Sequence, residues 1–275
     1  MLIIDGHSHV YPDKIAVKAS QAIGSFYDIG MFAGGTVGEL LECGINCEIN
    51  MHVICSVATV PEQAPRINDF IAQTAALYPE RFIGFATFHP DMEDIEYEVS
   101  RVIGLGLRGV KLHPDFQKFN IDDEGCGRLY KAVENRLPLL FHTGDRRNDF
   151  SSPRRILKIA ERFPGLDMIC AHFGGYTEWD EAERVLAGSR VWVDTSSSMS
   201  FLGKKRTLEL IGRFGEDRVI FGSDYPMWNP CDEVMMIKSL GLGAELTKKI
   251  FHKNIINLLR LDIRAWGADL TDDDV

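Results

Sequence analysis

The chain has 275 residues, of which 45% are hydrophobic and 25% are charged. These values are ordinary for a globular protein, and they exclude wholesale disorder, a collagen and a coiled coil. The chain has 30 Lys and Arg residues and 40 Asp and Glu residues, so its net charge is −10. This negative charge argues against nucleic acid as a partner, because phosphate backbones bind clustered positive charge.

Short apolar, β-branched runs alternate along the chain with stretches of helical periodicity. We expect strands at 2–7, 49–57, 82–88, 107–112, 138–142, 166–172, 191–195 and 218–223. We expect helices at 62–77, 92–104, 123–135, 153–163, 177–187, 204–214, 232–240 and 245–259. Such alternation is typical of a parallel sheet covered by helices, and a count of eight strands favours a closed (β/α)8 TIM barrel.

The first connection, residues 10–48, is much longer than the others and rich in glycine. We expect a lid-like excursion there with a helix near 36–43, because a loop this long in a compact enzyme is usually functional. Residues 1–275 are thus expected to form one α/β barrel domain with an elaborated first βα loop and a C-terminal helix.

No run of about 18 apolar residues occurs, so we expect no membrane span. The first twelve residues, MLIIDGHSHVYP, are too polar for a secretory signal, and we expect a cytoplasmic protein. The six cysteines contain no CxxC pair. We therefore expect free thiols rather than disulfides, with Cys43 and Cys47 as buried thiols.

Reactive side chains recur at the C-terminal ends of the predicted strands, the edge at which TIM barrels hold their active sites. His7 and His9 are two apart and share a face of the first strand, and imidazole is a common ligand of divalent metals. Two such histidines with a third and a carboxylate would form a metal site open to water. The strand-end residues are His7, His9, Lys111, His113, His142, His172 and Asp224.

Five segments stand at the predicted strand ends: DGHSHVYP at 5–12, RGVKLHP at 108–114, LPLLFHTGD at 137–145, MICAHFGG at 168–175 and VIFGSDYPM at 219–227. In these segments the chain resembles the amidohydrolase superfamily, in its amidohydrolase 2 (aminocarboxymuconate-semialdehyde decarboxylase-like) branch of metal-dependent barrels. The resemblance implies that His7, His9, His142 and Asp224 bind one divalent metal ion, zinc or else manganese. It also implies catalytic roles for Asp224, in proton transfer with metal-bound water, and for His172, in polarising the substrate.

Lys111 admits two interpretations. In two-metal members of the superfamily a lysine at this position is carboxylated and bridges the metals, whereas the GVKLHP context favours a plain ammonium that binds a substrate carboxylate. A lysine paired with a carboxylate for structural reasons stays open. We also expect His113 to support the rim and Trp228 to wall the pocket. We expect Arg146, or else Arg147 beside it, to reach a substrate carboxylate, with the alternative that both are solvated loop charges.

The leading function is a metal-dependent hydrolase that uses metal-activated water on a C–N or C–O bond of a small molecule. The alternative is a metal-dependent decarboxylase of a small carboxylic acid in the same site. A TatD-like nuclease is disfavoured by Lys111 and by the net charge, and a non-catalytic barrel leaves Asp224 and His172 unexplained. We expect a small-molecule substrate and, since dimers are common, a homodimer. The run Asp194-Thr195-Ser196 at the end of the seventh strand could hydrogen-bond groups around the metal ligands.

Overall fold

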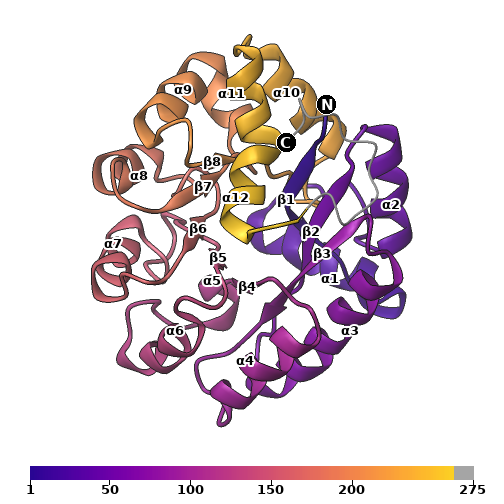
Figure 1. The fold of residues 1–275 in the computed structure, drawn as a ribbon, viewed down its shortest axis with the longest axis vertical. Helices are drawn as coiled ribbons and strands as arrows, with labels where there is room; N and C mark the ends of the chain where they lie inside the picture. Colours follow the sequence, from indigo (N-terminus) through magenta and orange to yellow (C-terminus); the bar gives the residue numbers. More distant parts are fainter. Residues whose placement is uncertain (263–275) are drawn as a thin grey trace.

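The computed structural model describes residues 1–262 and folds them as a ring of parallel strands surrounded by helices (Figure 1). Each strand pairs with the next in chain order. The ring closes where the main-chain N–H of Gly6 donates to the carbonyl of Phe221 across 2.8 Å and Ser8 bridges Tyr225. The strands are β1 (Ile4–His9), β2 (Met51–Cys55), β3 (Phe82–Thr87), β4 (Gly109–Leu112), β5 (Leu139–Phe141), β6 (Met168–Cys170), β7 (Trp192–Asp194) and β8 (Val219–Ile220).

The helices confirm the predicted alternation, although they differ from it in detail. In chain order they are α1 (Asp13–Tyr27), α2 (Val37–Asn46), α3 (Ala64–Leu77), α4 (Ile95–Gly104), α5 (Pro114–Gln117), α6 (Gly127–Val133), α7 (Pro153–Arg162), α8 (Trp179–Leu186), α9 (Met199–Phe214), α10 (Pro230–Ser239), α11 (Ala244–Lys248) and α12 (Asn254–Leu259). The predicted helix at 245–259 is divided into α11, a π-helical turn at Lys249–Lys253, and α12.

The excursion at 10–48 holds two helices rather than the one that the sequence predicts. Helix α2 matches the expected helix and begins with a capping box between Thr36 and Glu39. Helix α1 was not predicted, because the residues that it buries are Ala16, Ser20 and Gly24. Small residues four apart give little hydrophobic signal, yet they let the helix lie close against its neighbours.

Two hydrophobic layers hold the barrel. One lies between the strands and the surrounding helices, and the other fills the interior of the barrel near the N-terminal ends of the strands. Leu258 of α12 belongs to the inner layer together with Leu2, Ile4 and Trp192. Helix α12 therefore closes one end of the barrel, and the opposite end stays free to hold a site.

A disulfide joins Cys47, directly after α2, to Cys231 in the first turn of α10. The prediction of free thiols is wrong for this pair. The two cysteines are 184 positions apart in the sequence, and the packing of α2 against α10 brings them together. Cys43, Cys55, Cys126 and Cys170 are free, and Cys43 is half-buried rather than buried.

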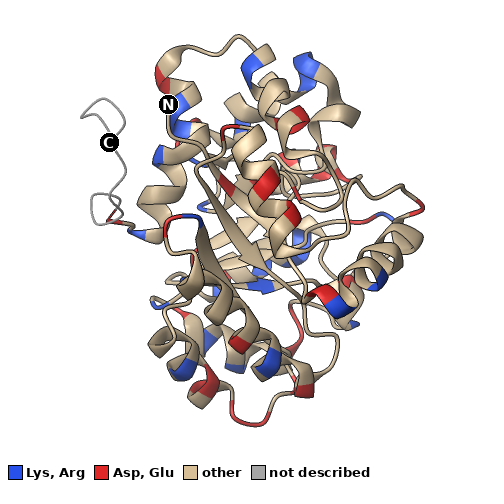
Figure 2. Cartoon of the chain, turned by 90° about the vertical axis from the view of Figure 1, so that its right-hand side faces the viewer, with Lys and Arg blue, Asp and Glu red and all other residues tan. Residues whose placement is uncertain are grey.

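Charged residues of both signs are interspersed over the helices in Figure 2. Many of them form ion pairs between neighbouring helices, such as Arg206 of α9 with Glu183 of α8. Among residues 1–262, no helix is both long enough and apolar enough to cross a membrane. The cytoplasmic location stays a prediction.

Candidate active site

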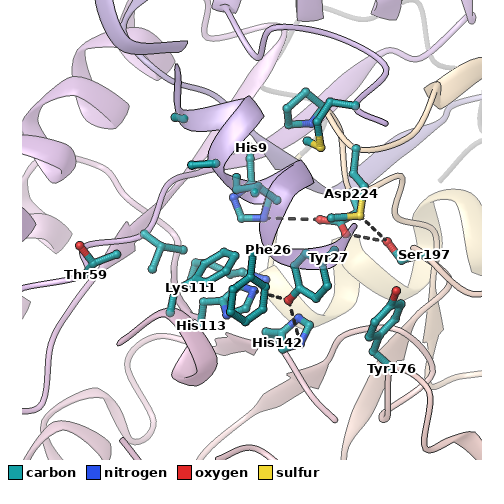
Figure 3. Close-up of a pocket in the computed structure, with 18 of the residues that line it drawn as sticks. His9, Phe26, Tyr27, Thr59, Lys111, His113, His142, Tyr176, Ser197 and Asp224 are labelled. Atoms are coloured by element: carbon teal, nitrogen blue, oxygen red, sulfur yellow. Dashed lines mark hydrogen bonds and ion pairs between the residues drawn. The ribbon is translucent and has the colours of Figure 1, made fainter. Parts of the chain in front are cut away.

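A cavity of about 360 Å³ lies at the C-terminal ends of the strands (Figure 3). Its floor is polar and its roof is apolar. The roof comes largely from α1, which contributes Ala19, Ala22, Ile23, Phe26 and Tyr27. The floor consists of strand-end side chains: His9, Lys111, His113, His142, His172 and Asp224.

Three of the predicted metal ligands converge at one point. His7 Nε2 lies 3.2 Å from His9 Nε2, and the two nitrogens lie 3.4 and 3.5 Å from Asp224 Oδ1. Ligand atoms about 2.1 Å from a common zinc ion at tetrahedral angles stand about 3.4 Å apart. The spacing of these three buried atoms therefore fits a divalent metal ion between them.

Lys111 lies against this group. Its side chain is only 1% exposed, and its Nζ is 2.8 Å from His7 Nε2. Burial lowers the pKa of Lys111, although the nearby Cys55 and Asp224 oppose that shift. No carboxylate among the described residues forms an ion pair with Lys111 within 4 Å, which leaves this group available to an anion in the cavity.

His142 lies on the floor but apart from the three convergent atoms. Its Nδ1 is 3.1 Å from His172 Nε2, and its Nε2 is 3.3 Å from the Tyr27 hydroxyl. It groups instead with His113 and Asp115. The His113 ring stacks on His142 with 4.0 Å between centroids. Both ring nitrogens of His142 contact other side chains, so its role as a metal ligand stays a prediction.

Burial lowers the pKa of the floor histidines. For His172 the pKa falls to about 3, because desolvation outweighs the nearby Asp194. The pKa values of His7, His9, His113 and His142 are lowered well below the usual range, in each case chiefly by burial. Neutral imidazoles are the form that binds metal ions, so the floor presents its histidines in the binding state.

Two hydrogen bonds in series fix the position of the Asp224 carboxylate. Ser197 Oγ donates to Asp224 Oδ2 across 2.6 Å, and Trp228 Nε1 donates to Ser197 Oγ across 2.7 Å. Trp228 thus orients Asp224 through Ser197 and is not among the side chains that line the cavity. Burial raises the pKa of Asp224 to about 7, with Lys111 and Ser197 acting in the opposite direction. A cation bound beside the carboxylate would also lower it.

The backbone is left-handed at several residues of the site. Positive φ angles occur at His172 (61°), Ser197 (49°) and Asp224 (58°). For residues other than glycine, such conformations cost on the order of 1–3 kcal/mol each and concentrate at functional sites. The turns after β6, β7 and β8 thus aim these side chains at one another at the expense of stability.

A second polar network lies beneath the cavity floor. Asp5 accepts hydrogen bonds from Ser8 Oγ (2.7 Å), Ser223 Oγ (2.6 Å) and the main-chain N–H of His7 (3.1 Å). Hydrogen bonds from these hydroxyls and from His52 lower the pKa of Asp5, although burial alone would raise it. This buried carboxylate therefore ties β1, β2 and the residues after β8 together directly below His7 and Asp224.

The two arginines after β5 differ from each other. Arg146 donates to the carbonyl of Thr177 across 3.1 Å, is exposed, and is not part of the cavity wall. Arg147 donates to the carbonyl of Phe26 across 2.7 Å and pairs with Asp145. The structure therefore places Arg147, rather than the predicted Arg146, beside the roof of the cavity.

Several residues of the site were not predicted from the sequence. Tyr27 and Phe26 were missed because α1 was not predicted, and Ser197 because one serine in a run of serines carries no signal of its own. Tyr176, which also lines the cavity, follows β6 at a distance that strand-end reasoning does not reach. Each of these residues lies in a connection after a strand rather than in a strand.

The sequence matches the amidohydrolase family over residues 52–261. Several solved structures are similar at 16–19% identity, a level at which the likeness concerns the fold alone. A 5-carboxyvanillate decarboxylase from Sphingomonas paucimobilis is 19% identical, with a TM-score of 0.71 over 94% of this chain and 99% of that one.

Two further decarboxylases have the same fold. A 2,6-dihydroxybenzoate decarboxylase from Rhizobium is 18% identical, with a TM-score of 0.72 over 95% of this chain and 99% of that one. A dihydroxybenzoic acid decarboxylase from Polaromonas, solved with manganese and the inhibitor 2-nitroresorcinol, is 16% identical, with a TM-score of 0.73 over 94% and 97%.

Proposed function

Because this chain belongs to the amidohydrolase family, we propose that it is a metal-dependent decarboxylase of a small aromatic carboxylic acid. The observation that carries the proposal is the division of one cavity into a cationic, metal-competent floor and an aromatic roof. A planar acid fits this cavity with its carboxylate toward Lys111 and its ring beneath Phe26 and Tyr27. The similar proteins that are named as hydroxybenzoate and carboxyvanillate decarboxylases support the choice.

His7, His9 and Asp224 are the residues that would hold the metal, with His142 as the further ligand that we infer. The metal would act as a Lewis acid on the substrate oxygens. Manganese is as good a candidate as zinc, since a similar decarboxylase was solved with manganese. We assign Lys111 as an ordinary ammonium rather than a carboxylated lysine. Its buried position beside His7 does not require a carboxyl group on the lysine nitrogen.

The reaction breaks the C–C bond between the carboxylate and the ring. The electron pair of that bond stays on the ring carbon, which takes up one proton as carbon dioxide leaves. Lys111 binds and orients the carboxylate, and the roof of α1 excludes water. We assign the handling of the proton to the Asp224 carboxyl, whose position Ser197 fixes.

Hydrolysis of a C–N or C–O bond has less support. It would use the same Asp224 carboxyl, in this case to accept the proton of an attacking water, so the proton-handling group does not separate the two reactions. The roof favours decarboxylation, because the apolar side chains of α1 suit an aromatic ring better than an attacking water.

Isotopes separate the two reactions. The protein loaded with manganese is incubated in D2O with hydroxybenzoic acids that carry 13C in the carboxyl group, and mass spectrometry follows the products. Decarboxylation releases 13CO2 and leaves one deuterium on the ring carbon. In parallel, esters and amides are offered in H2 18O. Uptake of 18O into a product acid, with no 13CO2 from any carboxylic acid, would refute the proposal.

A further inference from the structure

Asp194, the last residue of β7, is a buried hydrogen-bond hub. Its Oδ1 accepts from the main-chain N–H of His172 (2.9 Å), from the main-chain N–H of Ser196 (3.0 Å) and from Ser196 Oγ (2.5 Å). Its Oδ2 lies 2.9 Å from His7 Nδ1. One carboxylate thus contacts the residues after β6 and β7 on one side and a ligand on β1 on the other.

These contacts fix which ring nitrogen of His172 carries hydrogen. His172 Nδ1 lies 2.9 Å from Ser196 Oγ and 3.2 Å from the Ser196 carbonyl. A carbonyl only accepts, and the Ser196 hydroxyl already donates to Asp194, so His172 Nδ1 must be the donor. A neutral imidazole carries hydrogen on only one of its ring nitrogens, so His172 Nε2 is left without hydrogen.

The same order of hydrogen-bond donors and acceptors continues from His172 through His142 to Tyr27 in the roof. With no hydrogen on His172 Nε2, the contact of 3.1 Å requires His142 Nδ1 to donate. His142 Nε2 is then an acceptor, and the Tyr27 hydroxyl donates to it across 3.3 Å. The Tyr27 oxygen can in turn accept from His113 Nε2 at 3.0 Å. The acceptor atom of His142 thus faces the cavity.

His7 has the same arrangement directly. Its Nδ1 donates to Asp194 Oδ2, which leaves His7 Nε2 as an acceptor. The position of Lys111 agrees with this, because its ammonium only donates and lies 2.8 Å from that Nε2. His7 Nε2 is also the atom that converges with His9 and Asp224.

We propose that Asp194 is a positioning residue that holds His7, and through Ser196 and His172 also His142, in the tautomer with hydrogen on Nδ1. Two metal-ligand candidates, one in β1 and one directly after β5, thereby present an Nε2 without hydrogen to the cavity. The metal-binding consequence rests on the proposed function, whereas the tautomers themselves do not. Hydrogen bonds of this kind from a ligating histidine to a carboxylate orient the ring and raise its basicity.

Asp194→Asn is a specific test, because the orientation of the new amide is determined. Three donors converge on the Oδ1 position: two main-chain N–H groups and the Ser196 hydroxyl. The amide oxygen must take that position, so the amide nitrogen must face His7 Nδ1. The other acceptor near His7 Nδ1 is Ser196 Oγ, 3.2 Å away, and this oxygen already accepts from His172 Nδ1. His7 therefore accepts from the new amide at Nδ1 and carries its hydrogen on Nε2, the metal-facing atom. His172 and His142 keep their tautomers, because Ser196 still donates to the amide oxygen.

The tautomers are read by long-range 1H–15N correlation spectra of metal-free protein with 15N-labelled histidine. In the unsubstituted protein we expect hydrogen on Nδ1 of His7, His142 and His172, and on Nε2 of His113. In Asp194→Asn we expect His7 alone to change. Titration calorimetry with Zn²⁺ alone should show affinity lower by about 10- to 100-fold, the usual cost of losing such a partner.

Ser196→Ala is the matched control, because it removes a hydroxyl from the same hub and leaves the contact of Asp194 with His7 in place. We expect His7 to keep hydrogen on Nδ1 in this variant. Hydrogen on Nε2 of His7 or His142 in the unsubstituted metal-free protein would overturn the proposal. So would an unchanged His7 spectrum together with unchanged zinc affinity in Asp194→Asn. Neither outcome depends on whether the protein decarboxylates any acid.

Discussion

The guanidinium of Arg147 lies over the ring of Tyr27, with 5.2 Å between its central carbon and the ring centroid. It covers Phe26 in the same way at 4.8 Å and donates to the Phe26 carbonyl. The last turn of α1, which forms the roof of the cavity, is therefore fastened to the connection after β5. The same connection contains His142, which lies on the cavity floor.

Arg147→Gln should loosen this roof. Each cation–π contact is worth about 0.5–1 kcal/mol at such exposure, and the hydrogen bond to Phe26 is lost as well. We expect faster deuterium exchange over residues 20–30 and a higher KM. Arg146→Gln is the matched control, since Arg146 lies one residue away and, among residues 1–262, forms its hydrogen bonds with Thr177 rather than with α1. Equal exchange in the two variants would contradict the fastening role.

Asp224→Asn should abolish most turnover while the fold is kept. The amide can still accept from Ser197, but it can neither hold nor release the proton. We expect kcat to fall by about 10²- to 10⁴-fold, the range for loss of a general acid or base. Steady-state kinetics and circular dichroism measure this. Asp232→Asn, at an exposed position on α10, should leave kcat unchanged, and near-normal kcat in Asp224→Asn would exclude the assignment.

Lys111→Met should weaken substrate binding more than it slows the chemical step. A hydrogen bond to a charged group is worth about 1.5–3 kcal/mol, so KM should rise by about 10- to 100-fold with a smaller change in kcat. Lys131→Met, on the exposed face of α6, serves as the control. A loss of bound metal in Lys111→Met, from two ions per chain to none, would instead support a carboxylated lysine.

Removal of the disulfide should destabilise the protein. Cys47 and Cys231 close a loop that covers most of the chain, and native disulfides typically contribute about 2–4 kcal/mol. We expect the Cys47→Ser, Cys231→Ser double variant to lose that much free energy of unfolding in urea. Cys43→Ser alters a free thiol on the same helix and should change little, so an equal loss in both would refute the prediction.

Glu233 predicts a pH dependence of stability. The residue is 2% exposed, its Oε2 has no hydrogen-bond partner among the described residues, and burial raises its pKa well above the usual range. The folded state therefore keeps a proton that the unfolded state releases above about pH 4.5, so stability falls as the pH rises from there. Glu233→Gln should raise Tm at pH 8 more than at pH 5. A uniform change at both values would contradict this.

The barrel and the floor of its cavity could be predicted because both depend on which residues stand at the ends of the strands. Those residues can be identified from the local sequence. His7, His9 and Asp224 follow buried apolar runs, and parallel strands place such residues together whatever lies between them. Tyr27 could not be found this way. Its helix buries small residues, so neither the helix nor the direction of its last turn is visible in the hydrophobic pattern.

Contacts between residues far apart in the sequence could not be predicted either, because they depend on how the elements pack. The pairing of Cys47 with Cys231 depends on how α2 packs against α10. Likewise, no spacing rule separates Arg146 from Arg147, since only the path of the chain after β5 decides which one meets α1. The residues after β7 were recognised as supports, but the atoms of Asp194 that they engage appear only in three dimensions.

The roof of the cavity and most of its floor come from different stretches of the sequence. The part of the chain that matches the family begins at residue 52, whereas α1 and α2 lie before it. The match thus covers Lys111, His113, His142, His172 and Asp224 but none of the apolar side chains of α1. The apolar roof and most of the floor thus lie on separate stretches of the chain, and exchanging residues 10–48 between relatives would test whether this segment alters which acid is accepted.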